Sequence, residues 1–523
     1  MAAVELKQQF GSLDAVFLNF ERKEMPLHIG CVAICEGVLD FDRFVALIQS
    51  KLELIPRYRQ KVVRPLLNMG LPTWQWDPDF DIQRHIFKVD LDEPGTEEEL
   101  RQLTGRLFTD LLDRNKPLWE VYIVHGLEGG RSAIIAKVHH CMVDGVSGVA
   151  LLNIMFDTTP ETPPLPKPKR YRPPKPPDTT KLLTEALQNT IRFTMDQLSG
   201  AQKNLVRYGM MLMYDDRALS SVQKLLDSIP QLMAPLERLP FNRPCSGERR
   251  VAWSTYSFTE ARAIRTACGG SVNDVVLTIL TGAVMRYLKL HRESTKNRFF
   301  RVMVPVNLRQ EDERGTLGNV ISMLPVSLPL FIADPIERLK HIAAQTEAMK
   351  HAHVAELIHA GISWMGALPA PVQTLAGALP LLSTPVPIVH MISTNVPGPQ
   401  IPIYANGHRL LTLYPHVPAG WDVGLALAIQ SYDQKLFFAL TIDGAAAPDG
   451  ERMKDFLDAS FAELRKAAGV HPAEAPVAGP HVAPPVPKPP AKKRAKAKPK
   501  ATPPPEPAAE PTAERPGPVA ASA

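Results

Sequence analysis

The chain has 523 residues and a mass of 57.8 kDa, which exceeds what one hydrophobic core usually organises and predicts two domains. With 45% hydrophobic and 22% charged residues, the composition excludes a collagen-like chain, a coiled-coil rod and a wholly disordered protein. The formal net charge is +5, and residues 471–523 carry 8 Lys and Arg against 4 Asp and Glu. The body is therefore close to neutral, which argues against a nucleic-acid-binding body.

Cysteine content and hydropathy indicate the compartment. Five scattered cysteines, an odd number without a CxxC pair, favour a reducing compartment and no structural zinc. The N-terminal residues lack the apolar run of a signal peptide, and no stretch of about 18 uninterrupted apolar residues occurs elsewhere. These features predict a cytoplasmic protein that is at most peripheral to a membrane.

Proline is concentrated in two segments that divide the chain. Residues 160–178 hold 9 prolines in 19 positions, which predicts an extended linker or a strap laid over the surface. Residues 471–523 hold 16 prolines and the basic run AKKRAKAKPK, so we expect a disordered tail. Such a tail is either a solvated extension or a contact for anionic lipid headgroups, with nucleic acid as a third option. The predicted organisation is an N-terminal domain over 1–159, the linker, a helical connection and second domain over 179–470, and the tail.

The first domain shows alternating helical and strand patterns. Thr96 and Glu99 form a capping box ahead of leucines at helical spacing, which predicts a helix within residues 95–113. Two apolar runs, 118–124 and 133–138, flank a glycine-bearing turn and predict a hairpin. A short buried helix is expected over residues 147–156.

The second part of the chain repeats this mixed character. An amphipathic helical pattern covers residues 181–215, and a longer helix is predicted over 272–290. A strand is expected at RVMVPV, followed by a helix capped by Asp334 and Pro335. A hairpin around 431–434 precedes a last helix over 451–466, which closes at Gly469. The fold class is therefore α/β, with two halves joined by the proline-rich segment.

The strongest signal for chemistry is KVHHCMVDGVSG, residues 137–148, in which two adjacent histidines end a predicted strand. Side chains alternate along a strand, so His139 and His140 point to opposite faces and only one can reach a shared cleft. An imidazole in this position can accept a proton from a hydroxyl or a thiol. We assign His140 as that general base and expect His139 to pack or orient beside it.

The residues around the histidines admit structural interpretations as well. Asp144 can cap the following helix or hold an arginine, and Gly145 can permit a positive φ or the close approach of a substrate. A metal site made of His139, His140 and Asp144 is disfavoured, because adjacent strand histidines diverge and no further ligand cluster accompanies them. The sequence contains neither a Walker A loop nor a GxGxxG loop after a strand, so phosphoryl transfer and dinucleotide chemistry are not expected.

HHCMVDG, with PLWEVYIV upstream and SVNDVVLTIL downstream, resembles the bacterial wax ester synthase/acyl-CoA:diacylglycerol acyltransferase family. The opening GSLDAVFLNFE…MPLHIG and the later blocks MVPVNLR…GTLGNVISMLPVSLP and STNVPGPQ are similar to the same family. The resemblance covers residues 12–468. HHxxxDG alone also occurs in condensation domains and related CoA-dependent acyltransferases, so the set of blocks in this order is the more specific signal.

The resemblance implies two chloramphenicol-acetyltransferase-like domains with the active site in a channel between them. It implies an acyl-CoA-dependent O-acyltransferase that makes triacylglycerol from diacylglycerol or wax ester from a long-chain alcohol, with His140 as base and no covalent intermediate. Acyl-CoA would be a co-substrate, without a metal or prosthetic group, and the enzyme would associate with the inner membrane face or with lipid droplets. Asn273 and Asp274 would belong to the active-site wall, although residues 271–274 also fit a helix capping box.

Trp421, in GWDVG at residues 420–424, departs from the apolar or glycine-rich stretch usual in that family. It is either a bulky residue beside the tunnel or a core tryptophan at a domain junction. Two other functions stay open: an acyltransferase with another alcohol or a polyketide-type acceptor, and a non-catalytic lipid-binding or droplet-coating protein. The intact HHxxxDG favours an enzyme over the latter.

Overall fold

The computed structural model describes residues 10–64, 71–143, 145–161, 236–307, 321–351 and 389–472, together with Tyr171 and Gln188. Most of the predicted linker, nearly all of the helical pattern over 181–215 and nearly all of the predicted tail lie outside the described residues. The described residues all belong to one compact unit that extends to residue 473.

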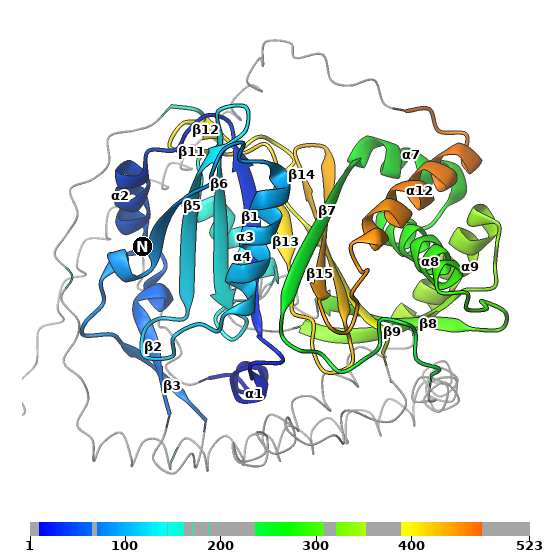
Figure 1. The fold of residues 1–523 in the computed structure, drawn as a ribbon, viewed down its shortest axis with the longest axis horizontal. Coiled ribbons are helices and arrows are strands. Elements are labelled where there is room, and N and C mark those ends of the chain that lie inside the picture. The colour runs from blue at the N-terminus through cyan, green and yellow to red at the C-terminus, as the bar shows by residue number, and fades with distance from the viewer. Residues whose placement is uncertain are drawn as a thin grey trace, which may run out of the picture. The chain divides into compact units, whose positions relative to one another are not determined.

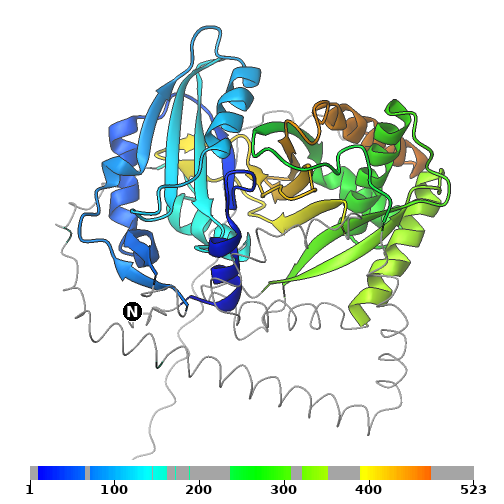
Figure 2. The ribbon, with the colours of Figure 1, turned by 60° about the horizontal axis from the view of Figure 1, so that its bottom comes forward.

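The first half contains helices and strands in alternation, as its patterns predict. Its elements are α1 (Ser12–Phe20), β1 (His28–Cys35), α2 (Phe41–Lys51), η1 (Pro56–Arg59), β2 (Gln60–Val63), β3 (Thr73–Trp76), η3 (Ile82–Arg84), β4 (Ile86–Asp90), α3 (Glu97–Thr109), β5 (Trp119–Leu127), β6 (Arg131–His139) and α4 (Gly145–Met155). One sheet in the order β13-β1-β6-β5-β4 organises them, where β13 (Tyr414–His416) comes from the second half. Helices α2 and α3 cover opposite faces of this sheet (Figures 1 and 2).

The predicted elements of the first half are confirmed. Strands β5 and β6 form the expected antiparallel hairpin, with Trp119 opposite Val138. Helix α3 begins at its capping box, where the Thr96 hydroxyl accepts the N–H of Glu99 and the Glu99 carboxylate accepts the N–H of Thr96 at 2.6 Å. Helix α4 starts at Gly145, two residues before the predicted start of the short helix.

The second half is built around a six-stranded sheet in the order β7-β15-β14-β10-β8-β9. Its elements are β7 (Arg249–Ser257), α7 (Phe258–Cys268), α8 (Val272–Leu290), β8 (Phe299–Asn307), β9 (Ile321–Pro329), α9 (Pro335–His351), β10 (Met391–Pro397), β11 (Tyr404–Ala405), β12 (His408–Arg409), β14 (Leu425–Tyr432), β15 (Lys435–Asp443) and α12 (Arg452–Ala467). The central strand β10 runs parallel to both β14 and β8. Helices α7, α8, α9 and α12 gather on one face (Figure 1).

Local signals in the second half also match the structure. Helix α8 has the predicted bounds, and the Asp334 carboxylate caps α9 by accepting the N–H groups of Ile336 and Glu337. The β14–β15 hairpin turns at Asp433 and Gln434, whose φ angles of 45° and 61° are typical of a tight hairpin turn. Gly469, with φ 68°, follows the last helix.

The second sheet is buried on both faces at β14 and β15, and alternate side chains of β15 show why. Leu436, Phe438 and Leu440 belong to the core under the helices. Phe437 and Ala439 point the other way and join the core of the first half. The two halves therefore share apolar packing at Phe437 and Ala439 of this strand.

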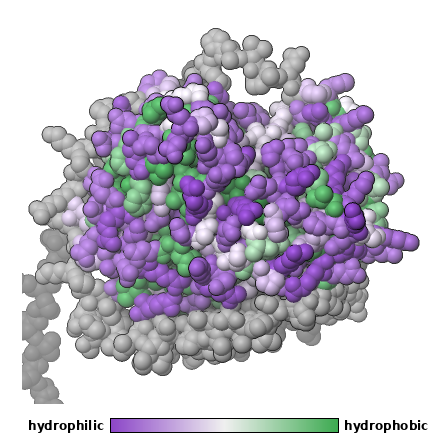
Figure 3. Space-filling view, in the orientation of Figure 1, coloured by the Kyte–Doolittle hydropathy of each residue, from purple (hydrophilic) through white to green (hydrophobic). Residues whose placement is uncertain are grey.

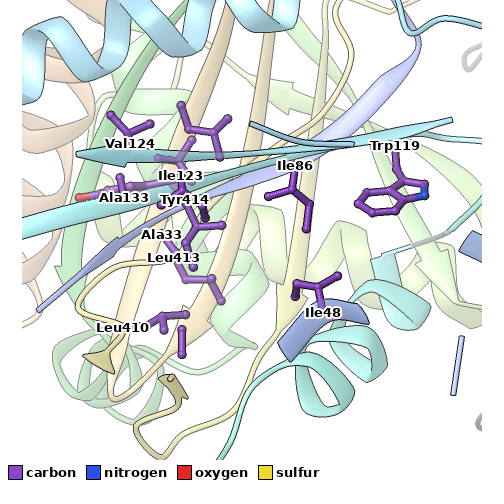
Figure 4. Packing of buried hydrophobic residues seen from close by; sticks show 14 of the residues in the cluster. Ala33, Ile48, Ile86, Trp119, Ile123, Val124, Ala133, Leu410, Leu413 and Tyr414 are labelled. Atoms are coloured by element: carbon purple, nitrogen blue, oxygen red, sulfur yellow. The ribbon is translucent and has the colours of Figure 1, made fainter. Parts of the chain in front are cut away.

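Residues 410–416 cross from the second half into the first. Strand β13 pairs antiparallel with β1, with His416 opposite Gly30. Figure 4 shows Leu410, Leu413 and Tyr414 packed with residues of the first sheet such as Ile123. The strands of each sheet thus come from one half of the chain except for this segment, which completes the first sheet.

One residue of the proline-rich linker is described. The Tyr171 hydroxyl donates to the carbonyl oxygen of Asp77 at 2.9 Å, and its ring lies edge-on to Phe80. The Arg59 guanidinium lies 5.3 Å from the centre of the same ring. At this position the segment is held against the first half, as a strap would be.

Among the described helices, none on its own has both the length and the apolar character to cross a membrane, whereas α7 and α8 taken together, with a 98° bend between them, meet the length and composition criteria.

Candidate active site

Three blocks of sequence meet where strand β6 ends. His139 is the last residue of β6 and lies opposite His28, the first residue of β1. Its N–H donates to the carbonyl oxygen of Leu118 at 3.0 Å, which ties it to the start of β5. The N–H of His140 donates to the carbonyl oxygen of Leu27 at 2.9 Å. The histidine pair is therefore fixed by backbone hydrogen bonds to both neighbouring strands.

The side chain of His139 is turned into the fold and is completely buried. Its Nδ1 accepts the N–H of Cys141 at 3.1 Å, so the neutral ring carries its proton on Nε2. That Nε2 lies 3.3 Å from Oε1 of Glu21. These contacts fit the orienting role that the sequence predicts for His139.

His140 is the accessible member of the pair. It is half-buried, and its imidazole stacks on the ring of Phe17 in α1, with centroids 4.0 Å apart and planes inclined by 13°. The aromatic ring covers one face of the imidazole and limits its rotation. Of the two histidines, only His140 is partly exposed.

Glu21, just after α1, is a functional candidate that the sequence reasoning missed. Its side chain is 1% exposed, Oε1 accepts the N–H of Leu27 at 3.1 Å, and Oε2 accepts from Arg114 at 2.9 Å. Burial alone would raise the pKa of Glu21, but the contacts with His139 and Arg114 outweigh it and hold the pKa well below its ordinary value. The only sequence signal was that Glu21 ends the conspicuous block GSLDAVFLNFE.

Other basic groups on the same face of the sheet are also buried. Lys137 donates to the carbonyl oxygens of Leu107 and Asp110 at the end of α3, at 2.8 and 2.7 Å. His28 Nε2 donates to the carbonyl oxygen of Phe108 at 2.7 Å. Burial lowers the pKa of His28 to about 3, so this imidazole is neutral near pH 7. These contacts attach the last turn of α3 to the sheet directly behind the histidine pair.

Cys141, next to the histidines, is buried, and burial raises the pKa of its thiol well above the ordinary value. The thiol is therefore protonated, as expected for a structural cysteine.

Asp144 lies outside the described residues. Gly145 begins α4, and the close approach of a substrate to it stays a prediction. The residues that the structure describes include no group of three His, Cys, Asp or Glu side chains that could hold a metal ion.

Asp274 acts as a helix cap in the second half. One carboxylate oxygen accepts the N–H and the hydroxyl of Ser271, both at 2.7 Å, and the other accepts the hydroxyl of Thr346 in α9 at 2.7 Å. Both oxygens are thus used within the fold, which favours the capping interpretation. Asn273 is half-buried in the first turn of α8, which packs on α7, α9, α12 and β9. The described contacts do not bring Asn273 to His140, and its substrate-binding role stays a prediction.

Trp421 lies where α1 meets the second half. Its ring is edge-on to Phe20, with centroids 5.9 Å apart, and packs with Met25 in a small apolar cluster. Its φ of 51° is unusual for a bulky side chain. The next residue, Asp422, forms an ion pair with Arg238 at 2.6 Å. This position agrees with a tryptophan at a junction, and a contact with a substrate tunnel stays a prediction.

A mixed α/β fold of two sheets, with an HHxxxDG strand end, is the architecture of CoA-dependent acyltransferases of the chloramphenicol-acetyltransferase type, as the resemblance implied. Residues 10–276 match the wax ester synthase/diacylglycerol acyltransferase catalytic domain, and residues 317–465 match the C-terminal domain of the same group. The chain belongs to the wax ester synthase/diacylglycerol acyltransferase family. The expected class of enzyme, an acyl-CoA-dependent O-acyltransferase, is thereby confirmed.

Relatives and solved structures agree with this assignment. The Mycobacterium tuberculosis protein named "Probable diacyglycerol O-acyltransferase tgs2" is 30% identical over 470 residues, which is 87% of this chain and 98% of the relative. The structure of the wax ester synthase/diacylglycerol acyltransferase from Marinobacter aquaeolei has a TM-score of 0.60 at 24% identity, covering 88% of this chain and all of that one. The starter condensation domain of rhizomide synthetase has the same fold, with a TM-score of 0.53 at 11% identity over 88% of this chain and 94% of that one.

Proposed function

We propose that His140 is the general base for transfer of a long-chain acyl group from acyl-CoA to the hydroxyl of diacylglycerol or of a long-chain alcohol. The observation that carries this proposal is the different burial of the two histidines. His139 is completely buried, with Nδ1 accepting the Cys141 N–H and Nε2 3.3 Å from Glu21, whereas His140 is half-buried at the strand end with one face on Phe17. The names of the relatives and of the family supply the two acceptor classes.

The reaction needs one base and one donor to the oxyanion. The His140 imidazole takes the proton of the acceptor hydroxyl as the oxygen attacks the thioester carbonyl carbon. A tetrahedral oxyanion forms, collapses to the ester, and breaks the carbon–sulfur bond. The imidazolium then returns the proton to the CoA thiolate. A thioester is already activated toward attack, so the proposal includes no metal and no prosthetic group.

Two sets of donors are candidates for the oxyanion. Helix α4 begins five residues after His140, and the first N–H groups of a helix have no partner within it. The second candidate is the amide of Asn273. Donors of this kind typically contribute about 10²- to 10³-fold to the rate of acyl transfer. Helix α4 also lies against β10 of the second half.

We propose in addition that the protein works at the cytoplasmic face of a membrane or on lipid droplets, attached in part by its basic tail. In the view of Figure 3 the described residues form a mostly hydrophilic surface with apolar side chains in small groups. Residues 471–523 carry a formal charge of +4, because 8 basic residues stand against 4 acidic ones. Each basic residue near an anionic lipid surface contributes about 1 kcal/mol to attachment. Deleting the tail should weaken sedimentation with anionic vesicles and leave turnover in detergent intact.

The test of the reaction is release of CoA thiol from palmitoyl-CoA by purified protein, with diacylglycerol or hexadecanol as acceptor. His140→Ala should abolish acceptor-dependent release. His408→Ala is the matched control and should keep full turnover, because His408 contacts the Glu36 carbonyl oxygen at the end of β1 opposite to the histidine pair. Equal release from wild type and His140→Ala would refute His140 as the base. No release with either acceptor would favour another acceptor or a binding role.

A further inference from the structure

We infer that Glu21 is a positioning residue for the reaction, which acts through His139 to hold His140 in its working orientation. This inference rests on the proposed role of His140. Glu21 lies outside the HHxxxDG motif, 118 positions before His139 in the chain. The structure nevertheless brings the two side chains to 3.3 Å.

The buried carboxylate of Glu21 is paired and hydrogen-bonded on both of its oxygens. A buried carboxylate is costly unless it is paired and hydrogen-bonded. Here Oε2 accepts from Arg114 Nη2, which also donates to the carbonyl oxygen of Leu18 at the end of α1. Oε1 faces the Leu27 N–H and His139 Nε2. The carboxylate therefore connects the end of α1, the start of β1 and the end of β6.

Two chains of contacts connect Glu21 to His140. The first runs through the side chain of His139, whose Nε2 proton faces the carboxylate while its Nδ1 accepts the Cys141 N–H just beyond His140. The second runs through Leu27, whose N–H is held by Glu21 and whose carbonyl oxygen accepts the His140 N–H. The residue on each side of His140 is thus fixed from the same carboxylate.

Helix α1 adds a third constraint in the same direction. Phe17, which stacks on His140, lies one helical turn before Glu21. If the carboxylate no longer holds the chain after α1, the stacked ring and the imidazole are free to shift relative to each other. A misplacement of about 1 Å at a reacting group can cost about 10²-fold in rate.

The first experiment compares Glu21→Gln with wild type in the CoA-release assay, at several concentrations of palmitoyl-CoA and acceptor. Gln keeps the shape but places an NH₂ group against one of the donors that surround the carboxylate. We expect kcat to fall about 10- to 100-fold while both KM values stay within about 2-fold. Glu21→Asp, which keeps the charge on a shorter side chain, should recover part of the loss.

A matched control is available in the second half. Glu260 of α7 is also buried and pairs with Arg465 at 2.9 Å, in the same kind of ion pair as Glu21 with Arg114. Glu260→Gln should lower the melting temperature and leave kcat unchanged. Equal losses of kcat in the two variants would show a general effect of destabilisation and overturn the inference.

The decisive measurement is a double-mutant cycle with His139→Asn. Asn keeps an acceptor for the Cys141 N–H but does not reach Glu21. If Glu21 acts partly through His139, adding Glu21→Gln to His139→Asn should lower kcat by a smaller factor than Glu21→Gln alone, because only the routes through Leu27 and α1 remain to be lost. Full multiplication of the two single losses would overturn the inference. If Glu21→Gln does not yield folded protein, the same cycle is run with Glu21→Asp.

The outcome separates this inference from the proposed function. If His140→Ala keeps its turnover, the base is wrongly assigned and the positioning role falls with it. If His140→Ala is inactive while Glu21→Gln has wild-type kcat, the base stands and only the role of Glu21 is refuted.

Discussion

The buried histidine at position 416 should make the protein sensitive to acid. His416 of β13 is 2% exposed, and neither ring nitrogen has a hydrogen-bond partner among the described residues. It packs between Phe108 and Trp253, with ring centroids 5.0 and 6.4 Å away. Burial lowers the pKa of His416 to about 3, because the charged ring would lose its hydration.

The magnitude follows from the difference between the folded and unfolded chains. In the unfolded chain the imidazole has its ordinary pKa of about 6.5 and takes up a proton as the pH falls below that value. In the folded chain it stays neutral until the pH approaches 3. Stability from this residue is therefore complete above pH 6.5 and is lost on acidification. Between pH 7 and pH 5 the loss is about 2 kcal/mol, with a limiting slope of about 1.4 kcal/mol per pH unit.

The perturbation is His416→Phe, which keeps an aromatic ring and removes the proton. A tight fit of the larger ring costs about 1–3 kcal/mol at every pH. The readout is therefore the difference in unfolding free energy between pH 7 and pH 5, from urea titrations followed by tryptophan fluorescence. The variant should lose about 2 kcal/mol less than wild type over this interval.

The control for this experiment is Tyr414→Phe, two residues away on the same strand. Burial raises the pKa of Tyr414 to about 12, so this hydroxyl takes up no proton in the same interval. Tyr414→Phe removes the hydrogen bond to Thr255 and should shift stability equally at both pH values. A pH dependence of His416→Phe equal to that of wild type would refute the reasoning, and so would a stronger one.

Two further predictions concern the folded core and the site. Asp443→Asn removes the charge partner of buried Arg249, at 2.7 Å, and should destabilise the protein by about 3–5 kcal/mol in urea titrations. Glu248→Gln, in the exposed pair beside it, should cost less than about 1 kcal/mol, and a similar cost for both would contradict the argument. Phe17→Leu removes the ring stacked on His140, an interaction of about 0.5–1.5 kcal/mol, so kcat should fall about 2- to 12-fold at constant KM. Unchanged kcat would show that the stacking does not orient the base.

Local signals in the sequence predicted the elements of the fold well. The capping box at Thr96 and Glu99, the β5–β6 hairpin and the bounds of α8 depend on residues within one or two turns of each other. Such signals lie in neighbouring residues, so they can be recognised without knowing which elements pack against each other. The exchange of β13 into the first sheet could not be predicted in this way, because a three-residue strand has no pattern of its own.

The site shows the same division between local and distant information. The adjacent histidines at a strand end predicted which residue could act as base, since alternation along the strand sends only one ring into the fold. The ring that goes inward, His139, then needs a partner, and no motif indicates which residue supplies it. Glu21, just after α1, contacts His139, and Phe17 within α1 stacks on His140.

The register of β1 against β6 explains why a carboxylate so far away in sequence can belong to the site. Because His28 pairs with His139, the chain entering β1 must pass beside the end of β6. The short connection between α1 and β1 therefore runs past the histidine pair. Glu21 occupies this connection, and Leu27 closes it with hydrogen bonds to both sides. The N-terminal block is thus a structural part of the strand end that carries the histidine pair, and a substitution there should change turnover before it changes substrate binding.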